Sequence, residues 1–78
     1  MTTQQLLDSR IRIGSIITSR RKELGLTQKA LAETTGILQT NISRIEKGKY
    51  SVGIDQMSKI AAALKCEINF DPKHYALL

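Results

Sequence analysis

The sequence predicts a mainly α-helical domain of four or five helices, followed by a short C-terminal strand. Apolar residues recur with the period of an amphipathic helix along most of the 78-residue chain. Glycines interrupt that period at several points, where one helix would end and the next begin. Near the C-terminus the period changes to two, which is typical of a half-buried strand. Because a chain of this length supports one small helical core, we expect residues 1–78 to form a single domain.

The first predicted helix covers residues 4–24 and ends before Gly25. At about 100° per residue, one stripe of this helix carries its apolar residues Leu6, Ile13, Ile17 and Leu24. Gly14 lies inside the helix and lowers its helix propensity. The N-terminal turns could therefore form a separate piece.

Two short helices follow, joined by a tight turn. Thr27 can cap the first of them, QKALAETT, which places the small Ala32 on its inner side and ends at Gly36. The second covers residues 38–47, and one face of it carries Leu38, Ile42 and Ile45. Gly36 suits the turn because a chain that reverses within about three residues favours a left-handed conformation, which glycine adopts freely. This pair of helices is a helix-turn-helix arrangement.

A fourth helix, of about three turns, follows the loop KYSVG. Its apolar stripe consists of Ile54, Met57, Ile60, Ala61 and Leu64. The period of two then appears at Cys66, Ile68 and Phe70, which predicts a strand over residues 66–71 that Pro72 stops.

A lone strand needs a partner for its backbone groups. The simplest partner is the same strand of a second subunit, paired antiparallel about a two-fold axis, which assigns dimerisation to Cys66, Ile68 and Phe70. A hairpin with an N-terminal segment is the alternative. Leu7 and Ile11 lie off the main stripe of the first helix and are candidates to pack beneath the strand.

The segment LTQKALAETTGILQTNISRIEKGK resembles the helix-turn-helix of the phage repressor and Cro-like (XRE-type) family. The downstream segment GIDQMSKIAAALK is similar to the next helix of that family, so the resemblance covers roughly residues 13–64. It implies a compact lambda-repressor-like DNA-binding domain with its motif at about 27–47. In this family the second helix of the motif lies in the major groove of DNA.

The resemblance also implies roles for individual residues. Those that would face base edges or nearby phosphates are Gln39, Thr40, Asn41, Ser43 and Arg44. Those that would hold the DNA backbone are Gln28, Lys47 and Lys49. The chemistry agrees, because Gln can pair with adenine, Arg with guanine, and Thr can contact thymine. An ordinary solvated face is the alternative for the exposed polar residues.

Three further residues complete the expectations from the family resemblance. Leu38 stands where family members usually carry a Ser or Thr cap, so the helix would begin less firmly by about 1 kcal/mol, or Leu38 would touch a thymine methyl. Arg21 and Glu46 would form a partly buried ion pair with a structural role.

Composition narrows the class of function. Twelve Lys and Arg against 7 Asp and Glu give a net charge of +5, which attracts polyanions such as nucleic acid or an anionic membrane. A single Cys excludes an internal disulfide and suits a reducing cytoplasm, and no apolar run reaches the length of a membrane span. No catalytic constellation, metal-ligand set or phosphate loop is visible, so we expect no enzyme activity, metal or cofactor.

We therefore predict a cytoplasmic homodimeric repressor that reads a palindromic operator in double-stranded DNA through residues 38–47, with no membrane partner. The alternative is an antitoxin that neutralises a toxin protein and autoregulates its operon, because a strand directly after the helix-turn-helix domain resembles certain antitoxin repressors. A third interpretation is a helix-turn-helix fold that binds only protein.

Overall fold

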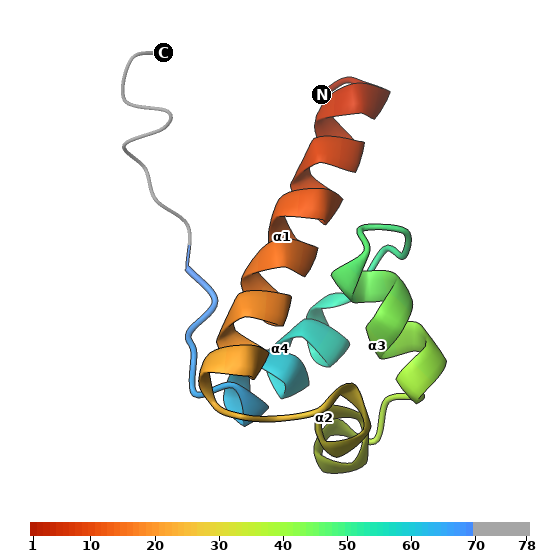
Figure 1. Ribbon diagram of the computed structural model, residues 1–78. Coiled ribbons are helices and arrows are strands. Elements are labelled where there is room, and N and C mark those ends of the chain that lie inside the picture. The colour runs from red at the N-terminus through yellow and green to blue at the C-terminus, as the bar shows by residue number, and fades with distance from the viewer. Residues whose placement is uncertain (70–78) are drawn as a thin grey trace.

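The computed structural model describes residues 1–69, and four helices account for most of them. These are α1 (Thr3–Glu23), α2 (Gln28–Thr35), α3 (Gln39–Glu46) and α4 (Ile54–Ala63). The predicted mainly helical fold is therefore confirmed. Figure 1 shows α2, α3 and α4 gathered around the C-terminal half of α1, whose N-terminal turns extend beyond them. None of the helices in this part of the chain is both long and apolar enough to cross a membrane.

The first helix is continuous through Gly14, so the alternative of a separate N-terminal piece is wrong. The helix begins with a reciprocal cap, in which Thr2 Oγ1 accepts from Gln5 N at 3.2 Å and Thr2 N donates to Gln5 Oε1 at 2.7 Å. Gly14 is buried, and an added Cβ would lie 2.5 Å from the carbonyl oxygens of Ile45 and Glu46. The glycine is therefore required because α1 crosses the end of α3 in backbone contact.

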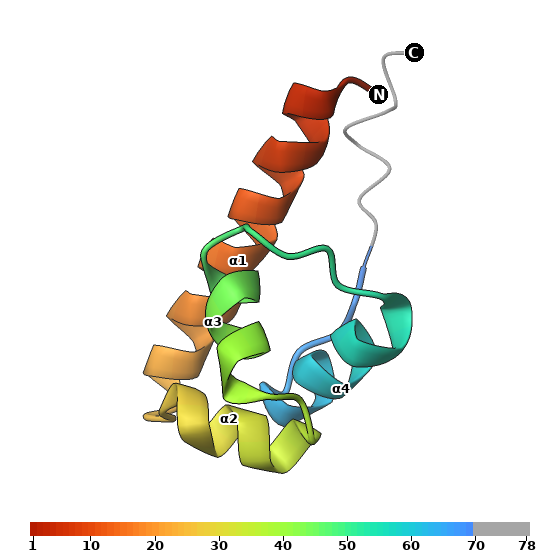
Figure 2. The ribbon, with the colours of Figure 1, turned by 90° about the vertical axis from the view of Figure 1, so that its right-hand side faces the viewer.

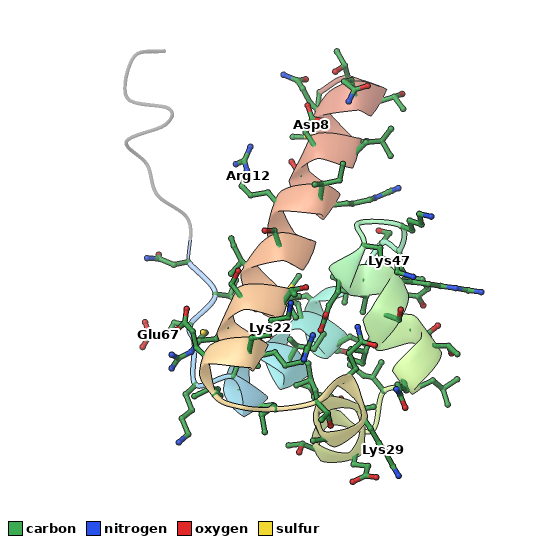
Figure 3. All side chains as sticks on the ribbon, in the orientation of Figure 1. Asp8, Arg12, Lys22, Lys29, Lys47 and Glu67 are labelled. Carbon is green, nitrogen blue, oxygen red and sulfur yellow. The ribbon has the colours of Figure 1, made fainter. Side chains whose placement is uncertain are left out.

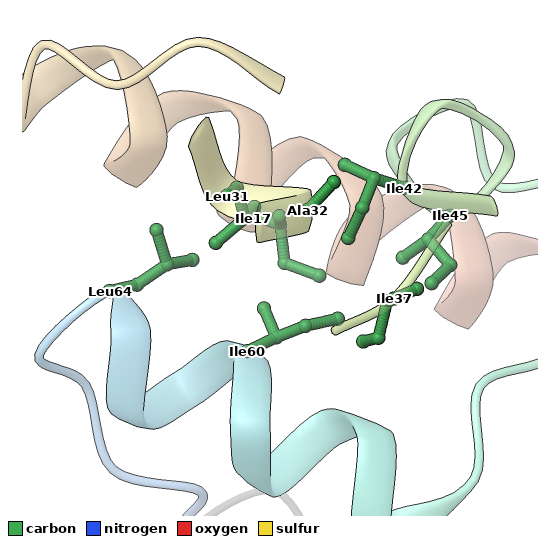
Figure 4. Close-up of a cluster of buried hydrophobic side chains, with 8 residues drawn as sticks. All are labelled: Ile17, Leu31, Ala32, Ile37, Ile42, Ile45, Ile60 and Leu64. Carbon is green, nitrogen blue, oxygen red and sulfur yellow. The ribbon is translucent and has the colours of Figure 1, made fainter. Parts of the chain in front are cut away.

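The hydrophobic core lies where the four helices meet (Figure 4). Leu31 of α2, Ile42 of α3 and Ile60 of α4 are completely or almost completely buried. Ile17 of α1 and Ile37 of the turn between α2 and α3 also belong to this cluster. Each fully buried side chain of this size contributes about 1.5 to 3 kcal/mol. The packing thus fixes α3 between α1 and α2.

Three residues that the helical pattern assigned to apolar stripes are exposed instead. Leu6 is 45% exposed because it lies on the turns of α1 that extend past the other helices. Leu38 is 70% exposed and precedes the first residue of α3, while Ile54 is 68% exposed and is the first residue of α4. Periodicity predicts the direction in which a side chain points from the helix axis. It does not predict whether another element packs there, and near a helix end there can be none.

The predicted strand is absent from residues 66–69, the part of it that the structure describes; Phe70 and Asp71 lie outside the described residues. The chain leaves α4 through Lys65, which has a φ of +56°, and Cys66 N donates to Ala61 O at 2.8 Å. A strand exists only where another strand pairs with it, and residues 1–69 of one chain supply no such partner. Leu7 and Ile11 are likewise exposed rather than packed beneath a strand.

A buried ion pair joins α1 to the end of α3, as the family resemblance predicted. Arg21 Nε lies 2.8 Å from Glu46 Oε2, and the two side chains are 11% and 5% exposed. Gln28 Nε2 of α2 also donates to Glu46 Oε1, at 3.1 Å, and the Thr18 hydroxyl lies 3.0 Å from the same oxygen. Burial alone would raise the pKa of Glu46. The hydrogen bonds from these three residues and the charge of Arg21 together outweigh that effect, so the pKa lies below its ordinary value of 4.5.

We predict that Glu46→Gln lowers the free energy of unfolding at pH 7 by about 2 to 3 kcal/mol, because it leaves the Arg21 cation buried without a counter-charge. The pKa of Glu46 is lower in the folded than in the unfolded chain. The stabilisation from its charge is therefore fully present above the pKa of the unfolded chain, and it is lost as the pH falls through the pKa of the folded chain. The difference between wild type and variant should therefore shrink below about pH 4.5. Urea unfolding across pH would measure it.

Glu23→Gln is the matched control, because Glu23 pairs with Arg20 on the surface, where its side chain is 64% exposed. This variant should lose less than about 1 kcal/mol. Equal losses in the two variants, or a loss in Glu46→Gln that does not change with pH, would contradict the role given to the buried pair.

Candidate nucleic-acid interface

A rigid turn sets the angle between α2 and α3. Gly36 ends α2 in the left-handed conformation, with a φ of +73°, and its N–H donates to Ala32 O at 2.9 Å. The buried Thr35 hydroxyl lies 2.8 Å from Leu31 O and accepts from Ile37 N at 3.3 Å. Because Ile37 is itself part of the core, the turn is held by both hydrogen bonds and packing.

The third helix presents its polar face to solvent. Ile42 and Ile45 are buried on one side, and no other helix lies in front of α3 in Figure 2. Of the residues predicted to read bases, Gln39, Thr40 and Arg44 are exposed on the outer side. Asn41 and Ser43 are half-buried. The structure therefore brings all five onto one short helix, with three of them fully open to a ligand.

The start of α3 has free backbone donors. Leu38 occupies the cap position and makes no side-chain hydrogen bond, as the family resemblance implied. Asn41 N and Ile42 N both donate to Leu38 O, and the amides of Gln39 and Thr40 have no acceptor among residues 1–69. Free amides at a helix N-terminus favour an anion such as a phosphate.

The electrostatics around α3 are positive. Between residues 37 and 51 the chain has one carboxylate, Glu46, whose charge is balanced by Arg21. Arg44, Lys47 and Lys49 are exposed and have no carboxylate within 4.0 Å in the described part of the chain. Figure 3 shows Lys47 at the upper end of α3. The outer face of α3 and the loop after it are therefore cationic.

The residues predicted to bind phosphates do not have equivalent environments. Lys47 and Lys49 are exposed, and their ammonium groups are available to a ligand. Gln28 is half-buried and already donates to Glu46, so a phosphate would have to use its second N–H. Thr18 of α1, to which the sequence analysis gave no role, also contacts Glu46. Only the packing of α1 on α3, which the sequence pattern does not specify, reveals that contact.

Two of the three residues predicted to dimerise border an apolar groove. Cys66 and Ile68 are exposed, and Phe70 lies outside the described residues. The groove runs between α1, α4 and residues 66–69, with a volume of about 470 Å³. Ile16 and Met57 line its other sides.

Comparison with known proteins agrees with this arrangement. A sequence model of the helix-turn-helix family matches residues 17–70. An HTH-type transcriptional regulator of Methanothermobacter thermautotrophicus is 46% identical over 50 residues, which cover 64% of this chain and 72% of that protein. The ImmF control region 10 kDa protein of Bacillus phage phi105 is 33% identical over 64 residues, which cover 82% of this chain and 70% of that protein.

A solved structure has the same fold. The crystal structure of the restriction-modification controller protein C.AhdI from Aeromonas hydrophila superposes with a TM-score of 0.75 and 27% identity, over 77% of this chain and 91% of that one. The family match covers more than half of the chain and includes all of α2, α3 and α4. This chain therefore belongs to the helix-turn-helix family, of the phage repressor-like (XRE) type that its sequence resembles.

Proposed function

We propose that this protein is a transcriptional regulator that binds specific DNA sequences through α3, as a homodimeric repressor on a palindromic operator in the cytoplasm. The observation that carries the proposal is the outer face of α3, which is polar, cationic and open to solvent. Its orientation is held by the core, by the turn at Gly36 and by Glu46. A helix presented in this way can enter the major groove.

The side chains on α3 match the chemistry of base edges. Gln39 can bond to adenine in bidentate fashion, Arg44 to guanine, and Thr40 can contact the methyl group of thymine. The exposed Leu38 is free to contact another thymine methyl. Lys47 and Lys49 would bind phosphates on the flanking backbone and so position α3 without reading sequence.

The names of the relatives support regulation as the outcome of DNA binding. The archaeal relative is described as a transcriptional regulator, the phage relative as a control region protein and the structural neighbour as a controller protein. By contrast, neither the described structure nor these relatives carry an observation that favours a toxin partner, so the antitoxin alternative has no support of its own.

The apolar groove supports a dimer. Around it, Ile16 of α1, Ile54 of α4 and Ile68 of the C-terminal segment all expose much of their surface. Burying such a patch against an identical patch removes apolar surface from water on both copies. The backbone groups of residues 67–69 have no hydrogen-bond partner within residues 1–69, so the same segment of a second copy can pair with them.

We predict that Arg44→Ala and Gln39→Ala each weaken binding to the preferred site by about 1 to 3 kcal/mol and relax the base preference at one position. Lys49→Ala should instead weaken binding to all sequences alike, because a phosphate contact carries no sequence information. The site would first be selected from random duplexes, and affinities for it and its single-base variants then measured at one salt concentration.

All three side chains are exposed, so the variants should unfold at the wild-type temperature. An Arg44→Ala protein with lower thermal stability and unchanged base preference would show that α3 does not read DNA.

We predict that Ile16→Glu and Ile68→Glu each convert the dimer to a monomer, because the new carboxylate would have to leave water for an apolar interface. Both side chains are exposed in the single chain, so folding should be retained. Leu7→Glu is the control, since Leu7 is also exposed but does not line the groove. Sedimentation of the three variants at micromolar concentration would decide. Dissociation by Leu7→Glu alone would move the interface to the N-terminal turns of α1.

A further inference from the structure

A second, smaller hollow lies between the N-terminal turns of α1 and the loop that follows α3. Its volume is about 170 Å³. Leu6, Ile13 and Ile45 contribute apolar surface to it, while Ser9, Arg10, Tyr50 and Ser51 contribute polar groups. Nothing in the roles assigned so far to α3 or to the apolar groove uses these polar groups.

This hollow is close to the proposed DNA-reading surface. Ile45 belongs to the last turn of α3, and Tyr50 and Ser51 follow directly after Lys49. The loop is pressed against α1, since a Cβ on Gly48 would lie 2.8 Å from Ile11 Cα. Gly48 also has a φ of +72°, which favours glycine. The position of the hollow relative to α3 is therefore set by backbone contact and not by flexible side chains.

The polar groups of the hollow suit an anion. Arg10 is half-buried and has no carboxylate within 4.0 Å among residues 1–69. None of the residues that line the hollow is acidic. A guanidinium group offers up to five N–H donors in a planar fork, and the hydroxyls of Tyr50 and Ser51 add further donors. Guanidinium and hydroxyl donors together are the groups that proteins commonly use to bind phosphate oxygens.

The other arginine of this part of α1 provides a contrast. Arg12 is two positions from Arg10, which places it about 200° around the helix. In Figure 3, Arg12 extends from the side of α1 that faces away from Lys47 and α3. It is exposed and lines neither of the two cavities described. The two arginines therefore carry the same charge and lie on the same helix, but they differ in position relative to the DNA-reading surface.

We propose that this hollow binds one backbone phosphate of the DNA, beyond the base pairs that α3 reads, with Arg10 as its main ligand and Ser51 as a second donor. The inference rests on the proposed function and extends its footprint along the duplex. Arg10 precedes residue 17, where the family match begins. The N-terminal turns of α1 thus add a contact from outside the part of the chain that matches the family.

The first test compares Arg10→Ala with Arg12→Ala, which lower the net charge equally. Affinity for the selected site would be measured from low to moderate salt. The Arg10 variant should bind about tenfold more weakly, and the slope of log affinity against log salt should become less steep by about 0.9 per subunit. Arg12→Ala should keep the wild-type slope. Equal slopes in the two variants would overturn the proposal.

The second test uses the wild-type protein, so it does not depend on how well a variant folds. Single phosphates on each side of the selected site would be replaced by uncharged methylphosphonates. One flanking replacement should weaken wild-type binding about tenfold and leave the affinity of Arg10→Ala unchanged. If no flanking replacement separates the two proteins, the hollow does not bind a phosphate.

These results distinguish this inference from the proposed function. A wild-type protein that prefers no duplex sequence would overturn both. A wild-type protein that selects a sequence, and loses that preference in Arg44→Ala, would uphold the proposed function; equal behaviour of the Arg10 and Arg12 variants would then overturn the phosphate site alone.

Discussion

The hydrogen bonds to Glu46 are the interaction on which the rest of this structure depends. Glu46 is the last residue of α3, and its carboxylate accepts hydrogen bonds from Arg21 of α1 and Gln28 of α2. Directly beside it, Gly14 lets the backbone of α1 touch the backbone of α3. One buried charge therefore ties three helices together at a point where no side chain separates two of them, and the direction of α3 follows from that arrangement.

The same interaction also determines the charge of the candidate DNA-binding surface. Glu46 is the one carboxylate between residues 37 and 51, and its pairing with Arg21 inside the protein leaves Arg44, Lys47 and Lys49 outside without an acidic neighbour. The interaction that orients α3 thus removes the negative charge that would repel DNA. Arg10 continues this cationic surface onto α1 in the phosphate site that we propose.

Much of the fold was predictable because it depends on local signals. Thr27 and Gly36 mark the start and the end of α2, as predicted. The apolar pattern around Ile42 correctly predicted which side of α3 is buried. The errors arose where a residue's environment depends on other elements. Leu38 and Leu6 are exposed because they lie where no neighbouring helix covers them.

The site was predictable in part for the same reason. Its location on α3 followed from the polar face and the family resemblance, whereas the hollow around Arg10 depends on how the loop after α3 packs on α1. A strand over residues 66–71 depends on a partner that residues 1–69 of one chain do not supply. The central claim is that the outer face of α3 reads DNA. Its most direct test is a titration of ¹⁵N-labelled protein with the selected duplex, in which the amide chemical shifts are measured. The account predicts the largest changes in residues 38–44 and 47–51, with small changes along α4. Large changes along α4 and the apolar groove, with α3 unaffected, would contradict it.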